Sequence, residues 1–160
     1  MTDVAIRKAS PTDLPQLYVL LRGKAEFDGA AEALTASEYE LRAALFCDSP
    51  KCEFVVADQG GVLVGFAAYY PVFSTYKARP GLWMDDLFVD SRYRDRGIGR
   101  DLLKFIAAEA SRRGCCKLEW SLQKSNSRGI AFYEREGAFI REENRFAKLD
   151  ESGIARLLSH

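Results

Sequence analysis

Residues 87–103 read LFVDSRYRDRGIGRDLL, and this stretch decides the fold. It begins as a strand, passes through a turn that contains Gly97 and Gly99, and continues as a long amphipathic helix. The free backbone N–H groups at a helix N-terminus, together with the positive end of the helix dipole, favour a bound phosphate. Glycines let a diphosphate approach the backbone because no Cβ is in the way. The stretch therefore predicts a strand–turn–helix unit with an anion-binding turn.

Two other phosphate-binding motifs do not fit this turn. A Walker P-loop requires Gly-x-x-x-x-Gly-Lys-Ser/Thr, which is absent, and the dinucleotide fingerprint requires a third glycine. The turn also carries arginines that could add charge-assisted contacts to an anion. These are Arg92, Arg94, Arg96 and Arg100. A plain strand-to-helix turn is the alternative interpretation of the two glycines.

Outward from this stretch, hydrophobic periodicity predicts one mixed α/β domain over residues 1–160, without repeats or linkers. Ser10 is expected to cap a first helix that ends near Gly23, and residues 35–38 resemble a capping box that starts a second. The later helices are expected to run from the glycine turn to Gly114 and from Ser127 to Glu136. The expected strands are residues 4–7, 53–57, 62–70, 81–89, 117–122 and 139–149.

Composition limits the possible classes of protein. Hydrophobic residues make up 48% of the chain, and 23 basic residues balance 23 acidic ones, so we expect a soluble globular protein rather than a nucleic-acid binder. The only histidine is His160, and the four cysteines lack zinc-site spacing, so no metal is expected. There is no signal-like segment and no run of 18 apolar residues. We therefore expect a reduced, cytoplasmic protein with no membrane partner.

The pattern Arg94-x-x-Gly97-x-Gly99, after a strand that ends Asp-Leu-Phe-Val, resembles the pyrophosphate-binding motif of the GNAT superfamily of N-acetyltransferases. The resemblance also includes residues 6–9, 64–66, 126 and 131–138. It implies the GNAT fold: a central mixed, mostly antiparallel twisted sheet with splayed middle strands and helices on both faces. Within the superfamily, the chain most resembles the diamine (spermidine/spermine) and thialysine acetyltransferases. The shared positions are Tyr69-Tyr70, residues 85–89, Tyr93-Arg94, Asn126 and Tyr133.

The resemblance implies acetyl-CoA as co-substrate and a direct transfer of its acetyl group to an amine. It implies Tyr133 as general acid, since a tyrosine hydroxyl can protonate a departing thiolate. Packing on a half-buried helix is the alternative for Tyr133, and ordinary helix capping is the alternative for Asn126. The implied cofactor-binding residues are Leu87, Phe88, Val89, Arg94, Asp95, Arg96, Gly97, Ile98, Gly99, Arg100, Asn126 and Tyr133.

Four acidic residues are candidates for binding the acceptor. Asp85 occupies the base position that the resemblance implies, although the polyamine group usually has Glu there, so a water relay is an alternative to direct action. Strand alternation predicts that Asp85 and Asp86 point to opposite faces. Asp28 aligns with another acidic contact, with a solvated loop acid as its alternative, and Glu119 ranks below the others. Such carboxylates would select an acceptor with a second cationic group.

Several functions stay open at this point. The acceptor could instead be a protein N-terminus, a protein lysine or an antibiotic, because such acetyltransferases share the cofactor motif. A sensor that binds acetyl-CoA without catalysis would need no general acid, so the presence of Tyr133 and Asn126 disfavours this function. A nucleic-acid-binding domain would need a basic surface beyond one turn. The resemblance further implies a homodimer.

Overall fold

The computed structural model of this protein describes residues 3–159. The chain forms two compact units, residues 1–121 and 122–160, and each is described by itself. The single domain expected over residues 1–160 stays a prediction. The first unit contains β1 (Ala5–Lys8), η1 (Pro11–Asp13), α1 (Leu14–Phe27), η2 (Ala31–Ala33), α2 (Glu38–Leu45), β2 (Glu53–Gln59), β3 (Val62–Ser74), β4 (Arg79–Val89), η3 (Ser91–Tyr93), α3 (Ile98–Arg112) and β5 (Leu118–Glu119), where η marks a 3-10 helix.

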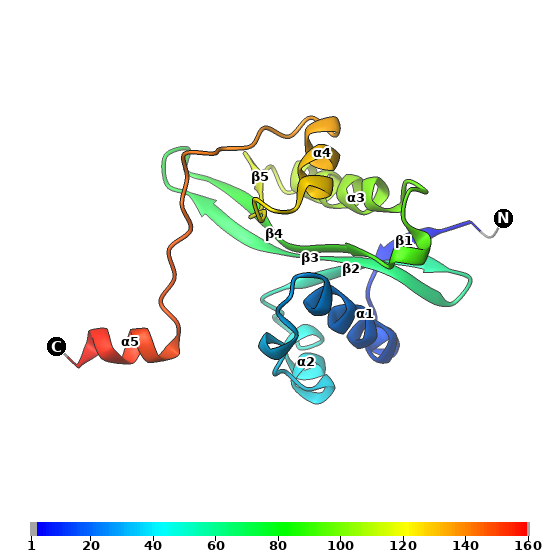
Figure 1. Ribbon diagram of the computed structural model, residues 1–160, viewed down its shortest axis with the longest axis horizontal. Helices are drawn as coiled ribbons and strands as arrows, with labels where there is room; N and C mark the ends of the chain where they lie inside the picture. Colours follow the sequence, from blue (N-terminus) through cyan, green and yellow to red (C-terminus); the bar gives the residue numbers. More distant parts are fainter. Residues whose placement is uncertain (1–2, 160) are drawn as a thin grey trace. The chain divides into compact units, whose positions relative to one another are not determined.

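A five-stranded sheet in the order β1-β2-β3-β4-β5 forms the centre of the first unit. Neighbouring strands from β1 to β4 run antiparallel, whereas β5 runs parallel to β4. Helices α1 and α2 lie on one face of this sheet, and α3 lies on the other (Figure 1). The expected fold class, a mixed and mostly antiparallel sheet with helices on both faces, is confirmed.

Strand β3 is longer than expected. The sequence pattern placed Pro71 in a loop, but the structure continues β3 to Ser74 and pairs Pro71 with Leu82 of β4. Strand β2 begins at Glu53, opposite Tyr69, so β3 borders only β4 beyond that point. A proline lacks an N–H donor and is tolerated where one edge of a strand has no neighbour.

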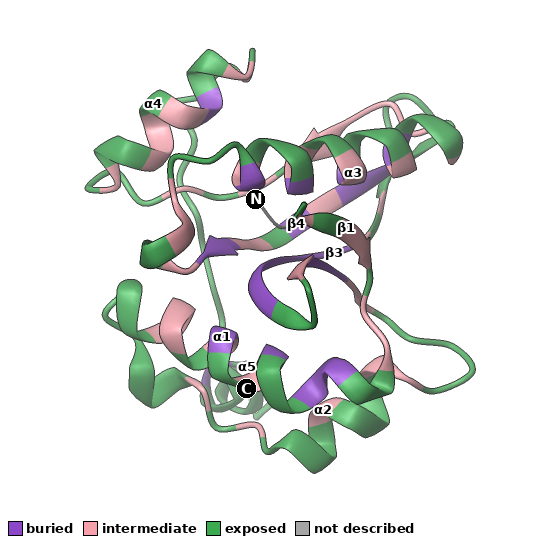
Figure 2. Cartoon of the chain, turned by 90° about the vertical axis from the view of Figure 1, so that its right-hand side faces the viewer, coloured by how far each residue is buried: buried purple, intermediate pink, exposed green. Residues whose placement is uncertain are grey.

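The apolar core lies on both faces of the sheet, where buried segments of α1 and α3 meet the strands (Figure 2). Leu17 and Leu20 of α1 pack with the aromatic rings of Phe66 and Phe88. Helix α3 buries residues four positions apart, which form the stripe expected of an amphipathic helix. These residues are Ile98, Leu102, Ile106 and Ala110.

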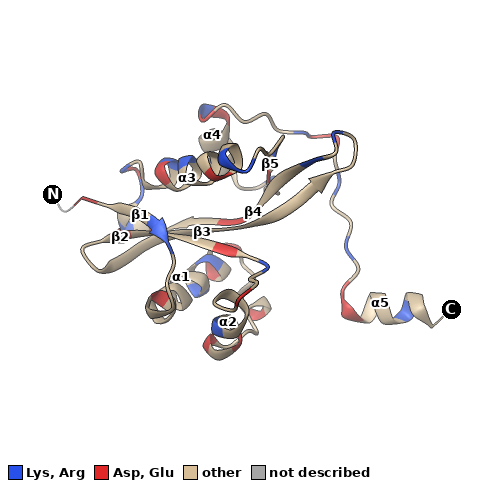
Figure 3. Ribbon diagram, turned by 180° about the vertical axis from the view of Figure 1, so that it is seen from behind, with Lys and Arg blue, Asp and Glu red and all other residues tan. Residues whose placement is uncertain are grey.

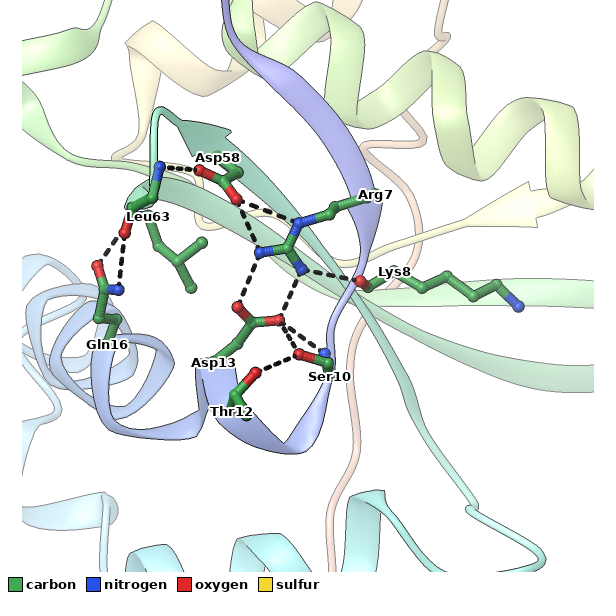
Figure 4. A network of polar contacts seen from close by, with 9 residues as sticks. Arg7, Lys8, Ser10, Thr12, Asp13, Gln16, Asp58 and Leu63 are labelled. Atoms are coloured by element: carbon green, nitrogen blue, oxygen red, sulfur yellow. Dashed lines mark hydrogen bonds and ion pairs between the residues drawn. The ribbon is translucent and has the colours of Figure 1, made fainter.

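A charged network joins the start of α1 to the sheet (Figure 4). The guanidinium of Arg7 contacts the carboxylate of Asp13 at 2.7 and 2.8 Å and that of Asp58 at 2.8 Å. Asp13 also accepts a hydrogen bond from the Ser10 backbone N–H at 2.7 Å. The predicted helix start, with Ser10 at the cap and Asp13 in the first turn, is therefore confirmed.

Gly23 does not end α1 as the sequence pattern predicted, because the helix continues to Phe27. A Cβ at Gly23 would lie 3.3 Å from the Phe88 ring, so this glycine permits a close approach of helix and strand. The longest helix, α3, has 15 residues. Within residues 3–159, no helix is long and apolar enough to cross a membrane.

The second unit contains α4 (Ser127–Arg135) and α5 (Glu151–Leu158). The strand predicted at residues 139–149 was wrong, since the structure gives this segment no regular secondary structure. A strand needs a neighbour for its backbone hydrogen bonds, and residues 122–159 contain no other strand. Helix α5 was not predicted, although Asp150 accepts a hydrogen bond from the Gly153 N–H at 2.8 Å and caps it.

Candidate functional site

Strand β4 has one free edge over about half its length. It pairs with β3 from Arg79 to Val89, but it pairs with β5 only at Leu82 and Trp83. Within residues 3–159, no strand therefore borders β4 on its β5 side from residue 84 to residue 89. The predicted cofactor residues Leu87, Phe88 and Val89 all lie in this part of the strand. Backbone groups on such an edge can pair with an extended ligand.

A β-bulge interrupts β4 at the two consecutive acids. Asp86 lies opposite Ala68 and Met84 lies opposite Tyr69, so Asp85 has no counterpart on β3. The strict alternation on which the expectation of opposite faces for Asp85 and Asp86 rests is therefore interrupted at this point. Opposite faces for the two acids stay a prediction. Bulges are frequent beside active sites, where they redirect a side chain.

The turn after β4 leads directly into α3. Asp90 caps η3 through the backbone N–H of Arg92 at 3.0 Å. Gly97 precedes α3 with φ of 83°, a left-handed conformation that favours glycine, and Asp95 has φ of 61°. A Cβ at Gly97 would meet no atom within 4 Å, so the space above the turn is open. The predicted residues Arg94 to Arg100 thus comprise a turn with two left-handed residues, Asp95 and Gly97, and the first residues of α3, and a helix N-terminus suits an anion.

The arginines of this turn make contacts within the protein. Arg92 pairs with Asp90 at 2.7 Å. The Arg94 side chain donates to the Val89 carbonyl at 2.9 Å, and its guanidinium lies 4.9 Å from the centre of the Phe27 ring. Arg96 donates to the Arg92 carbonyl at 3.1 Å. These arginine side chains therefore have fewer donors left for an anion than the sequence indicated.

The acids Asp28 and Asp86 are brought together by Lys24. The Lys24 ammonium of α1 forms an ion pair with Asp28, the C-cap residue of the same helix. It lies 3.1 Å from the Asp86 carboxylate of β4. The side chains are 19% exposed for Lys24, 29% for Asp28 and 23% for Asp86, so all three are substantially withdrawn from solvent. Figure 3 shows a red, acidic segment on the β4 ribbon.

Burial raises the pKa of Asp86 above its ordinary range. Lys24 offsets part of this rise, whereas the neighbouring carboxylates of Asp85 and Asp28 add to it. The pKa of Lys24 is also raised, because its contacts with Asp28 and Asp86 outweigh the effect of its own burial. Lys24 is therefore charged at neutral pH, within a cluster that has an excess of acid. Perturbed acids of this kind are concentrated at functional sites.

Cys52 lies beside the same acids. Burial raises the pKa of its thiol to about 12, and the carboxylates of Asp85 and Asp86 contribute to the rise. The thiol is therefore protonated at neutral pH, and a protonated thiol is a poor nucleophile. Within residues 3–159, no group of three or more His, Cys, Asp or Glu side chains could hold a metal ion.

A hollow of about 550 Å³ lies between α1, β4 and the start of the turn that follows β4. Gly23 and Phe27 line it from α1, on either side of Lys24 in sequence, and Phe88 and Arg94 line it from β4 and the turn. Phe88 follows Asp86 by two residues on the same strand. The hollow is therefore lined by sequence neighbours of the acidic cluster, and Phe27 and Phe88 form part of its wall.

The remaining predicted residues are placed as follows. Glu119 of β5 lies opposite Trp83, pairs with Lys117 at 2.7 Å and is 49% exposed. In the second unit, Asn126 accepts a hydrogen bond from the Gly129 N–H at 2.9 Å and caps α4. Tyr133 is buried, at 8% exposed, and its ring packs edge-on against Phe132 at 5.0 Å. Their roles in chemistry stay predictions.

The sequence analysis missed Lys24 and Cys52. One signal for Lys24 was present, because a lysine four residues before Asp28 on a helix is placed to form an ion pair with it. No local signal connects Lys24 with Asp86, which lies 62 residues further along the chain.

Comparison with known proteins places this arrangement in a family. The model of the acetyltransferase (GNAT) family matches residues 16–138. A thialysine N-epsilon-acetyltransferase from Bos taurus is 32% identical over 146 residues, covering 86% of this chain and 85% of the relative. An L-ornithine N5-acetyltransferase from Arabidopsis thaliana is 25% identical over 189 residues, with 90% and 83% covered. An integron cassette protein from the mobile metagenome of V. cholerae has a similar structure, with a TM-score of 0.80 at 25% identity over 100% of this chain and 99% of that one.

Proposed function

Because this chain belongs to the GNAT acetyltransferase family, we propose that it moves the acetyl group of acetyl-CoA to the primary amine of a small cationic molecule. Candidate acceptors are diamines, polyamines and lysine-like amino acids such as thialysine. One observation carries the proposal. Strand β4 bears the acids Asp85 and Asp86 on the same stretch whose free edge leads to the left-handed turn at Gly97.

Two features of the first unit fit coenzyme A. The free edge of β4 at Leu87, Phe88 and Val89 offers backbone groups to an extended pantetheine arm. The open turn before α3, with Gly97 in the left-handed conformation, offers N–H groups to a diphosphate. Asn126 contributes its amide in this proposal. Bound acetyl-CoA would supply an activated thioester. In this proposal Asp85 acts on the amine and Tyr133 on the thiolate.

The acceptor amine must lose a proton before it can attack. Its pKa in solution is about 10.4, so a base is needed at neutral pH. Asp85, displaced by the bulge, accepts this proton in our proposal, directly or through a water molecule. Tyr133 donates a proton to the departing thiolate. Direct transfer is favoured over a cysteine-bound intermediate because the raised pKa of Cys52 keeps its thiol protonated.

Acceptor binding is assigned to the acids near Lys24. The neutral reacting nitrogen carries no charge to pair, whereas a second ammonium on the acceptor can contact Asp86 or Asp28. Glu119 of β5, opposite Trp83 and with its side chain 49% exposed, is a further candidate. Acidic contacts of this kind favour cationic acceptors over neutral amines, since the two carboxylates outnumber the single ammonium of Lys24 and leave an excess of negative charge.

The proposal is tested by measuring acetyl-CoA-dependent thiol release with diamines, polyamines, lysine-like amino acids and neutral monoamines. Tyr133→Phe should lower kcat on the order of 10²–10⁴-fold with little change in KM for acetyl-CoA, because only the proton donor is removed. The variant keeps the ring that packs against Phe132. Tyr39→Phe, at an 80% exposed position of α2, is the matched control and should keep full activity. A decrease of kcat below about threefold in Tyr133→Phe would show that Tyr133 only packs against its neighbours and does not donate the proton.

A pair of glycine variants tests the cofactor site. Gly97 and Gly114 flank opposite ends of α3 with φ of 83° and 67°, and a Cβ at either would meet no atom within 4 Å. Alanine should therefore strain both positions equally, by about 1 kcal/mol. Only Gly97→Ala should weaken acetyl-CoA binding, by about tenfold (~1.4 kcal/mol), when affinity is measured by calorimetric titration. Equal affinities of the two variants for acetyl-CoA would show that the diphosphate does not bind at this turn.

A further inference from the structure

Lys24 occupies the place where an acceptor cation would be expected. The proposed acceptor-binding acids Asp28 and Asp86 both contact its ammonium, so neither is an unpaired anion waiting for a substrate. A lysine ammonium has three N–H donors, and these carboxylates take two of them. The third donor is left for a further acceptor atom, and the Lys24 side chain is 19% exposed, so a substrate atom can reach it.

We propose that Lys24 is a specificity-determining residue, which makes the enzyme favour amino acids that carry a terminal amine over diamines and polyamines that lack a carboxylate. This inference rests on the proposed function and deepens it. In an amino acid, the α-carboxylate accepts a hydrogen bond from Lys24 while the α-ammonium contacts the neighbouring acids. A plain diamine offers the same ammonium but leaves the third N–H of Lys24 without an acceptor.

The charges of the cluster support this preference. Lys24, Asp28 and Asp86 together carry one net negative charge, and the exposed Asp85 beside them brings the total to two. An acceptor head group with one ammonium and one carboxylate adds no net charge and pairs with both signs. Additional ammonium groups of a polyamine would instead approach Lys24, and like charges at short distance in a partly desolvated site repel.

A purely structural role for Lys24 is the competing interpretation. Lys24 joins the C-terminal part of α1 to β4, so its removal would also loosen this contact. A loss of packing alone would lower activity with all acceptors in the same proportion. The readout that separates the two roles is therefore a ratio of acceptors and not the activity itself.

The sharpest acceptor pairs differ only by the carboxylate: L-lysine against 1,5-diaminopentane, and L-ornithine against 1,4-diaminobutane. For each pair, kcat/KM is measured with the wild type, Lys24→Met, Lys24→Arg and Lys8→Met. Lys8→Met is the charge-matched control, since Lys8 pairs with Glu53 at 2.9 Å and is 52% exposed. The wild type should prefer each amino acid over its diamine by about tenfold, because the additional contact involves two charged groups.

In Lys24→Met this preference should fall about tenfold, to parity or below. Lys24→Arg should retain most of the preference because it keeps the positive charge, and Lys8→Met should leave it unchanged. An unchanged ratio in Lys24→Met, or a wild type that uses diamines as well as the amino acids, overturns the role of Lys24 and leaves the acetyltransferase assignment intact. If the wild type acetylates none of the amines, the proposed function itself fails, and the inference fails with it.

Discussion

Two charge clusters of the first unit have the same number of cations and aspartates, but the pKa of an aspartate is shifted in opposite directions in the two. Each contains one cation and two aspartates from different elements: Arg7 with Asp13 and Asp58, and Lys24 with Asp28 and Asp86. Hydrogen bonds from Arg7 hold the pKa of Asp13 and that of Asp58 below their usual range. In the second cluster, burial raises the pKa of Asp86 despite the contact with Lys24.

The burial of Asp86 and the geometry of the two cations together explain the difference between the clusters. The planar guanidinium of Arg7 contacts Asp13 through two nitrogens and Asp58 through two, as Figure 4 shows. The Lys24 ammonium is a point charge and cannot bind both oxygens of a carboxylate in this way. Asp86 is moreover close to other acids that carry the same charge. The Arg7 cluster therefore stabilises the fold, whereas the Lys24 cluster keeps the carboxylate of Asp86 in an environment that disfavours its charged form.

Asp13→Asn should have the largest effect on stability. The change replaces one carboxylate oxygen by an amide that faces the donors of Arg7 and Ser10, so the free energy of unfolding should fall by about 2 kcal/mol. Urea unfolding measures this change. Glu40→Gln alters a similar but exposed capping box at α2 and should cost much less. Equal losses in both variants would show that Arg7 adds nothing beyond helix capping.

Asp86→Asn should affect function more than stability. We expect kcat/KM for a cationic acceptor to fall by about tenfold (~1.4 kcal/mol), since the acid that pairs with the acceptor is lost. The free energy of unfolding should stay the same or rise, because the folded protein disfavours the ionised form of Asp86. If Asp86→Asn unfolds more readily but keeps its preference for cationic acceptors, Asp86 has a structural role, like Asp13, and does not bind the acceptor.

The pH dependence of unfolding should give the smallest effect and distinguish the clusters by sign. Asp13 and Asp58 have lowered folded pKa values, so their stabilisation is present above the ordinary aspartate pKa and is lost as the pH falls through the folded values. Asp86 has a raised folded pKa, so its ionisation costs stability at neutral pH and the cost disappears on acidification.

Unfolding free energies are measured from pH 7 to pH 3 for the wild type and Asp86→Asn. Any stability advantage of Asp86→Asn at pH 7 should shrink as the pH falls. An advantage that instead grows on acidification would mean that Asp86 behaves like Asp13.

Much of the fold could be predicted from local patterns. The order of elements was right from β1 to α4, because apolar spacing, caps and turn glycines are properties of neighbouring residues. The strand expected at residues 139–149 failed because alternation alone cannot supply the partner that a strand requires. Likewise, the position of Gly23 indicated a helix end, whereas its contact with Phe88 on another element explains the glycine.

The sequence by itself determined the strand, turn and helix of residues 87–103 and, through them, the family and its chemistry. Those features depend on backbone conformations and N–H groups that a few consecutive residues control. Only the tertiary structure decided that β4 bulges at Asp85 and that Lys24 binds both Asp28 and Asp86. These interactions depend on distances between segments far apart in the chain and on the burial of their side chains. The raised pKa of Asp86 therefore exists only in the folded protein.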